Sequence, residues 1–151
     1  MPPRALRLGV ETAEARDIGR ALDAALASGR DIALAIGPEA AVDLREGSRL
    51  AAALASLVVP RLPKLGGLVM TGGETARAIL VAAGIQGLRL RGEIEPGVPL
   101  GTGIGRFAIP VVTKAGAFGD RHTLLRCRAA LRRGRGAASD ATAAIGNPIG
   151  R

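Results

Sequence analysis

The sequence predicts a single α/β domain in which helices pack on a largely parallel or mixed sheet. Two observations lead to this fold class. Amphipathic helical segments alternate with short apolar runs, and such alternation implies crossover connections between strands of one sheet. In addition, 48% of the 151 residues are hydrophobic, which is ample for the core of one domain. The chain has two Phe and no Trp or Tyr, so that core must be aliphatic.

In chain order, the expected elements alternate between helix and strand. Thr12 can cap the first helix, and Pro60 prevents continuation of the second. Apolar runs bounded by glycine, proline or charged residues indicate the strands, and a polar connection is expected at Glu39–Gly47. The expected helices are Thr12–Ser28, Ser48–Val58, Ala76–Ala83 and Arg121–Arg132, and the expected strands are Asp31–Ile36, Leu68–Met70, Leu88–Ile94 and Pro110–Thr113.

Two glycine-rich stretches are expected to lie outside regular structure. Gly101–Gly105 reads G-T-G-I-G, which has the spacing of half a dinucleotide-binding pattern. That pattern must open a helix, whereas a proline follows closely here, so we expect a flexible hairpin loop. Residues 132–151 are rich in Gly, Ala and Arg without an apolar period. They predict a basic, disordered tail after a domain that spans residues 1–131.

The first candidate site is the turn formed by Gly72, Gly73, Glu74 and Thr75, between a buried strand and a helix start. Two adjacent glycines leave no Cβ between the backbone and an anion, and the first turn of the helix offers N–H groups without intrahelical partners. This geometry can cradle a phosphate. A strand-to-helix turn can also need glycine only to change the direction of the chain, so both interpretations stay open on these residues alone.

A second glycine turn, Lys114–Asp120, follows the strand at Pro110–Thr113. Lys114 and the bare amides beside Gly116 could bind a nucleotide, while Asp120 caps the next helix. The alternative is a solvated lysine and glycines that only turn the chain. Because the carboxyl ends of parallel strands line one crevice, both turns are expected to face the same pocket. The chain has no Walker A sequence, so a nucleotide site must be of another type.

Composition argues against several other functions. The net charge is +8, but the basic residues are scattered except at Arg126–Arg135. The aromatic platforms of single-strand binders are missing, so the charge does not predict a nucleic-acid partner. Cys127 and His122 are the only residues of their types, which excludes an internal disulfide and a zinc site, and no metal ligands are expected. His122 has no visible partner for base catalysis, and Cys127 is expected to be a buried, inert thiol.

No apolar run has the length of a signal peptide or a membrane span, so we expect a cytoplasmic protein.

Three segments together resemble a known family. They are V-M-T-G-G-E-T-A at Val69–Ala76, L-R-L-R-G-E-I-E-P-G-V-P-L at Leu88–Leu100 and P-V-V-T-K-A-G-A-F-G-D at Pro110–Asp120. In this order and with these gaps they are similar to the C-terminal nucleotide-binding domain of the four-carbon acid sugar kinases, which include the threonate, erythronate and 3-oxo-tetronate kinases. The resemblance covers about Thr12–Leu125 and does not extend into the basic tail.

The resemblance implies a domain that binds ATP, while a separate N-terminal domain holds the sugar acid. Gly72, Gly73, Glu74 and Thr75 match the family's nucleotide-binding turn, and Gly116 matches the glycine of its second turn. Lys114 would neutralise charge, and Mg²⁺ would bridge the phosphates, as phosphoryl transfer generally requires. The resemblance identifies no catalytic residue in this chain.

The sequence also departs from the family pattern. Ala76 replaces a common serine and Ala117 a common glycine, and the serine-bearing segment that precedes the domain has no counterpart before Met1. Full-length members are more than twice as long. We therefore expect half of a split kinase, a degraded gene or a truncated chain. The alternative function is a non-catalytic module that binds a nucleotide or nucleic acid.

Overall fold

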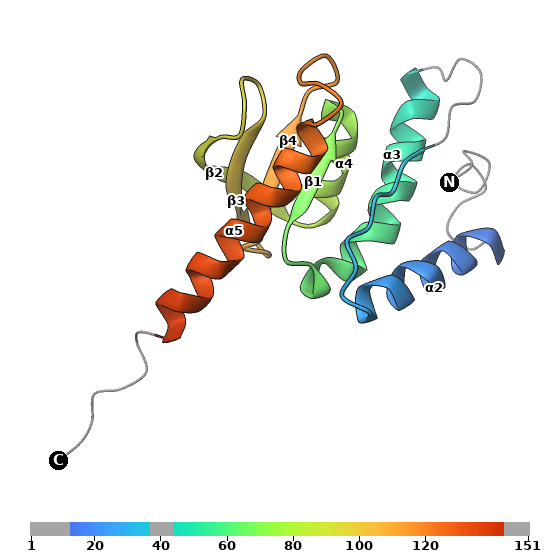
Figure 1. Cartoon of the computed structure of the whole chain (residues 1–151). Coiled ribbons are helices and arrows are strands. Elements are labelled where there is room, and N and C mark those ends of the chain that lie inside the picture. Colours follow the sequence, from blue (N-terminus) through green and yellow to red (C-terminus); the bar gives the residue numbers. More distant parts are fainter. Residues whose placement is uncertain (1–12, 37–43, 144–151) are drawn as a thin grey trace.

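The computed structural model describes residues 13–36 and 44–143, which form a mixed sheet with helices on both faces (Figure 1). The helices are α2 (Ala13–Ala27), α3 (Leu44–Val58), the 3₁₀ helix η1 (Val59–Lys64), α4 (Gly73–Ala82) and α5 (Thr123–Ala143), and the strands are β1 (Leu68–Thr71), β2 (Ile85–Glu93), β3 (Pro99–Gly105) and β4 (Pro110–Lys114).

The sheet has the strand order β1-β4-β3-β2. Only β1 and β4 are parallel, whereas the β2–β3 and β3–β4 pairs are antiparallel. The short connections from β2 to β3 and from β3 to β4 cause this pattern, because antiparallel neighbours can be joined by a tight turn and parallel neighbours cannot. The predicted α/β fold is confirmed, with the mixed sheet rather than the largely parallel one.

The core lies on both faces of the sheet. Val111 and Val112 are adjacent on β4 and both are fully buried, because successive strand residues point to opposite faces. Val111 packs with Leu54 and Ile79, from α3 and α4. Val112 packs on the other face with Cys127 of α5, and Figure 1 shows α5 crossing this face. The predicted burial of Cys127 is confirmed.

Arg61 of η1 attaches α2 to the rest of the domain. Its guanidinium donates to both carboxylate oxygens of Asp23, at 3.1 and 2.7 Å, and to the backbone oxygen of Gly19 at 2.9 Å. The Arg61 side chain is 16% exposed and that of Asp23 is 45% exposed, so the guanidinium is shielded from water while the carboxylate is not. Hydrogen bonding from Arg61 lowers the pKa of Asp23.

The predicted buried strand at Asp31–Ile36 is wrong, because this extended segment is not assigned to the sheet. Ile32 is 38% exposed, and only Leu34 and Ile36 pack against the core near α3. Asp31 is instead bound by Arg128 and Arg132 of α5. An apolar run indicates burial of some side chains, but burial against a helix needs no strand pairing.

The predicted hairpin loop at Gly101–Gly105 is also wrong, because these residues belong to β3. Gly101 and Gly103 are buried where backbones approach closely. A Cβ on Gly103 would lie 2.5 Å from the Phe107 carbonyl oxygen, and one on Gly101 would lie 2.8 Å from that of Arg89. The glycines therefore permit tight packing within the sheet. As predicted, the segment opens no helix.

Three helices are longer than predicted, including α4, which begins at Gly73 instead of Ala76. α3 begins at Leu44, one turn before Ser48, and most of the predicted connection Glu39–Gly47 lies outside the described residues. α5 continues to Ala143, so its predicted end at Arg132 is too early. Alanine and arginine have high helix propensity, which here outweighs the cost of the interspersed glycines. Of the predicted tail, residues 144–151 lie outside the described part of the chain.

Candidate functional site

The parallel pairing of β1 with β4 places the two glycine turns side by side. Thr71 and Lys114, the last residues of the two strands, are partners in the ladder. Directly beyond them, the backbone N–H of Gly72 donates to the carbonyl oxygen of Lys114 at 2.9 Å. Both predicted turns therefore leave the same end of the sheet and are joined to each other by the backbone.

The first turn leaves backbone amides uncovered. Gly72 is the N-cap of α4 with φ +91° and ψ 125°, a conformation that favours glycine, and no side chain caps the helix. Gly73 is the first helical residue, and nothing lies within 4 Å of the position that its Cβ would occupy. The first N–H groups of an α-helix have no intrahelical acceptor, so those of Gly73, Glu74 and Thr75 can bind an anion.

The Glu74 side chain is engaged with protein groups. Ser48 of α3 donates its hydroxyl to Glu74 Oε1 at 3.2 Å, and Arg77 lies 3.5 Å from the same oxygen. The Glu74 side chain is 49% exposed. A carboxylate in the first turn of a helix also interacts favourably with the helix dipole. Glu74 therefore has a structural role in linking α4 to α3.

In the second turn, the Lys114 ammonium folds back over its own loop. Nζ donates to the carbonyl oxygens of Ala115 and Gly116, at 3.1 and 3.2 Å. Lys114 forms no ion pair with a carboxylate in the described part of the chain. The space where a Gly116 Cβ would lie is open to 4 Å. The cation and the uncovered backbone of this turn are therefore available to an anionic ligand.

Asp120 ends the second turn and caps the last helix, as the sequence predicts. Its Oδ1 accepts a hydrogen bond from the backbone N–H of His122 at 2.7 Å and from Arg126 at the same distance. Hydrogen bonding from Arg126 is the main cause that lowers the pKa of Asp120, and the His122 N–H adds to it. His122 is exposed, and its Nε2 accepts from Arg121 at 3.0 Å.

The sequence does not indicate that Glu95, Thr123 and Arg126 support the second turn. Glu95, between β2 and β3, accepts hydrogen bonds from Thr123 and Arg126 of α5. In the sequence, the tripeptide E-P-G at residues 95–97 indicates only a turn, and Arg126 belongs to a basic run. No local pattern could have paired residues that lie this far apart in the sequence.

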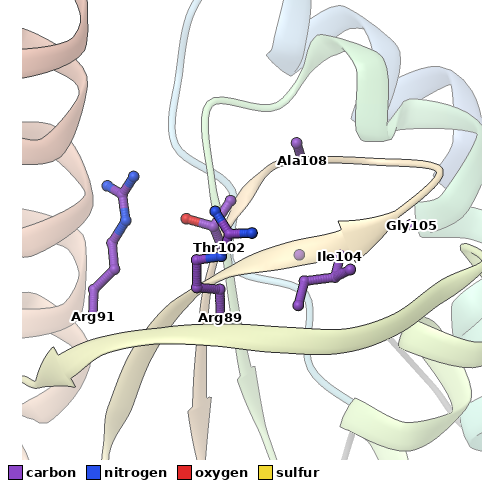
Figure 2. Close-up of a pocket in the computed structure, with 7 residues that line it drawn as sticks. Arg89, Arg91, Thr102, Ile104, Gly105 and Ala108 are labelled. Atoms are coloured by element: carbon purple, nitrogen blue, oxygen red, sulfur yellow. The ribbon is translucent and has the colours of Figure 1, made fainter.

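A separate hollow lies on the face of β2 and β3 (Figure 2). It is lined by Arg89 and Arg91 of β2 together with Thr102 of β3, and Figure 2 shows the two arginines rising from β2 on the same side as Thr102. Thr102 pairs with Pro110 at the start of β4, whereas Lys114 is at the end of β4. The hollow is therefore distinct from the two joined turns.

The described residues offer neither a cluster of metal ligands nor a membrane-spanning helix. Within residues 13–36 and 44–143, no group of three or more His, Cys, Asp or Glu side chains is arranged to hold a metal ion. Among the described helices, none combines the length and the apolar character that crossing a membrane requires.

Comparisons with known proteins identify the family. Residues 2–124 match the model of a family described as a nucleotide-binding C-terminal domain. The chain is 47% identical over 127 residues to the D-threonate kinase of Cupriavidus necator, covering 82% of this chain and 31% of that enzyme. It is 33% identical over 108 residues to the 3-oxo-tetronate kinase of Pseudomonas savastanoi pv. phaseolicola, covering 71% of this chain and 25% of that enzyme.

A solved structure shares the fold. It is a domain of unknown function from Bordetella bronchiseptica, crystallised with bound citrate as a domain-swapped dimer, with a TM-score of 0.60 and 32% identity over 87% of this chain and 34% of that one. The chain thus spans about a third or less of the length of these relatives. On these matches and on its α/β fold, the chain belongs to the four-carbon acid sugar kinase family, in which it corresponds to the nucleotide-binding C-terminal domain.

Proposed function

We propose that this chain binds ATP at the two joined turns and is the nucleotide-binding part of a cytoplasmic kinase that phosphorylates a four-carbon sugar acid. The observation that carries the proposal is the hydrogen bond between Gly72 and Lys114, which unites two uncovered glycine turns at one end of the sheet. The kinases among its relatives support the same reaction class. Threonate, erythronate and 3-oxo-tetronate are the candidate acceptors.

The residues of the two turns fit a polyphosphate. The amides of Gly73, Glu74 and Thr75 would bind phosphate oxygens at the positive end of the α4 dipole. Lys114 would exchange its contacts with two neutral carbonyl groups for charge-assisted hydrogen bonds to a phosphate, which are about twice as strong. Mg²⁺ usually binds through one or two carboxylates and the phosphates themselves, so it would neutralise charge chiefly on the nucleotide.

The proposal is tested by the substitution Gly73→Val. Nothing lies within 4 Å of the position that a Gly73 Cβ would occupy, so a valine has space there and would fill the volume that a phosphate needs. We expect a folded variant whose affinity for ATP is at least tenfold lower, which corresponds to about 1.4 kcal/mol. The measurement is titration of a fluorescent ATP analogue.

Gly134→Val is the matched control, because Gly134 is also helical and nothing lies within 4 Å of its Cβ position. It should change the affinity little. Unchanged affinity in a folded Gly73→Val chain would remove this turn from the binding site.

We also expect that this chain assayed by itself phosphorylates no sugar acid efficiently. Holding an acceptor in line with the γ-phosphate can contribute on the order of 7–11 kcal/mol, and we identify no acceptor site among the described residues. His122 is not a convincing base, because its Nε2 already accepts a hydrogen bond from the neighbouring arginine.

The assay is ADP release from Mg-ATP in the presence of threonate, erythronate or 3-oxo-tetronate. We expect background release from the chain alone and an increase of orders of magnitude when the substrate-binding part of a related kinase is added. Rapid turnover by the chain alone would refute this expectation. Binding of ATP without any stimulation would instead favour the alternative function, a non-catalytic nucleotide-binding module.

A further inference from the structure

We propose that Glu95 is a positioning residue, which holds the Lys114–Asp120 turn in the conformation that binds the nucleotide. The inference rests on the proposed function, because it concerns the same site. Glu95 lies between β2 and β3, outside both glycine turns, and its carboxylate lies beside Gly119 of the second turn.

Glu95 forms two hydrogen bonds with the last helix. Its Oε1 accepts from the hydroxyl of Thr123 and its Oε2 from Nε of Arg126, both at 2.5 Å. The Glu95 side chain is only 15% exposed, and Thr123 is fully buried. Buried polar groups of this kind need their partners, and a partly satisfied network costs more than its separate bonds suggest.

The same two residues of α5 hold the end of the second turn. The hydroxyl oxygen of Thr123 accepts from the backbone N–H of Asp120 at 2.8 Å, while Arg126 donates to the Asp120 carboxylate at 2.7 Å. Glu95 thus orients both of the side chains that fix Asp120. Glu95 also occupies the space beside Gly119, because a Cβ on that residue would lie 2.7 Å from Glu95 Oε1.

A second contact joins the same segments. The ring of Phe118 packs on Gly97, where an added Cβ would lie 2.5 Å from the ring carbon Cδ1. Gly97 has φ +77°, which also favours glycine at this point. The turn that begins at Glu95 therefore supports the far end of the nucleotide-binding loop, while the bond from Gly72 to Lys114 fixes its near end.

This arrangement implies a specific effect on binding. Residues 115–117 of the loop are exposed between the two fixed ends. A loop that is already held in its binding conformation loses less conformational entropy when a ligand binds. Removing the carboxylate of Glu95 should release the far end of the loop and weaken nucleotide binding, although Glu95 itself need not touch the nucleotide.

The experiment compares Glu95→Ala and Glu95→Gln with Glu93→Ala. Glu93 is the matched control, because it is exposed at the end of β2 and its carboxylate forms no hydrogen bond or ion pair with the side chain of another described residue, although its backbone pairs with Pro99. We expect the dissociation constant of a fluorescent ATP analogue to rise about tenfold in Glu95→Ala. The rise should be smaller in Glu95→Gln, which can still accept from Thr123, and Glu93→Ala should match the wild type.

Amide hydrogen exchange separates positioning from general destabilisation. In Glu95→Ala we expect faster exchange at Phe118, Asp120 and His122, and unchanged exchange in α3 and α4. If Glu95→Ala does not fold, Thr123→Val and Thr123→Ser provide the same test. Thr123→Ser keeps the hydroxyl that donates to Glu95, so it should retain the affinity for the ATP analogue. Thr123→Val removes this hydroxyl and should bind the analogue more weakly.

The outcomes distinguish this inference from the proposed function. Wild-type affinity in folded Glu95→Ala, with Gly73→Val impaired, would overturn the role of Glu95 and leave the ATP site standing. If amide hydrogen exchange in Glu95→Ala became equally faster in α3, α4 and the loop, the role of Glu95 would also be overturned. The substitution would then destabilise the whole domain rather than the loop. A wild-type chain that does not bind the analogue would overturn both proposals.

Discussion

The substitution Gly103→Ala tests why β3 contains alternating glycines. A methyl group at this position would lie 2.5 Å from the carbonyl oxygen of Phe107 and 3.3 Å from Cδ1 of Ile85. The first contact is to backbone, which cannot rotate away as a flexible side chain can. The strand or the chain near Phe107 must therefore shift to accept alanine.

The expected cost follows from this overlap. Inserting one carbon atom into a well-packed region costs typically about 1–3 kcal/mol. For a chain of this size, each kcal/mol lowers the thermal midpoint by roughly 2–4 °C, so we expect a decrease of about 2–12 °C. Gly87→Ala is the matched control on the neighbouring strand, where the nearest atom to the added Cβ is Ile104 Cδ1 at 4.0 Å. That variant should be neutral or more stable by about 0.4–1 kcal/mol, because alanine restricts the unfolded chain.

Thermal unfolding followed by circular dichroism measures both variants, and titration of the ATP analogue shows whether the site is affected. A midpoint for Gly103→Ala within a degree of the wild type would refute the argument from close packing. Loss of nucleotide binding in such a fully stable variant would instead make Gly101–Gly105 a ligand-binding segment.

Two further predictions concern ionisable groups. Burial raises the pKa of the Cys127 thiol above its ordinary value of 9.0, and the residue is 0% exposed. A thiol reagent at pH 8 should therefore modify the native chain orders of magnitude more slowly than the denatured chain. Rapid, complete labelling of the native chain would contradict this. Arg126 lowers the pKa of Asp120 below its ordinary 3.8, so the contribution of Asp120 to stability is present above that value and is lost as the pH falls through the lower, folded-state pKa. Asp120→Asn should remove this part of the acid unfolding profile, measured by thermal midpoints between about pH 2 and 5, and an unaltered profile would show that the carboxylate contributes nothing.

The sequence by itself determined the features that depend on neighbouring residues. The apolar runs Leu68–Met70 and Pro110–Thr113 are strands, and a glycine turn follows each of them. Pro60 ends the α-helix at Val58 as predicted, although a 3₁₀ helix continues the chain. Hydrophobic periodicity and the conformational effects of proline and glycine extend over only a few residues, so they can be recognised in the sequence. The residues of the candidate site could therefore be proposed from the sequence alone.

The tertiary structure decided which of these segments meet. Only strand pairing makes Lys114 the neighbour of Thr71, and only packing brings Glu95 to Thr123 and Arg126. It also decided that Asp31–Ile36 stays outside the sheet and that Gly103 serves close packing rather than a loop. The physical reason is that strand pairing and backbone approach depend on groups far apart in the chain, and local propensity carries no information about them.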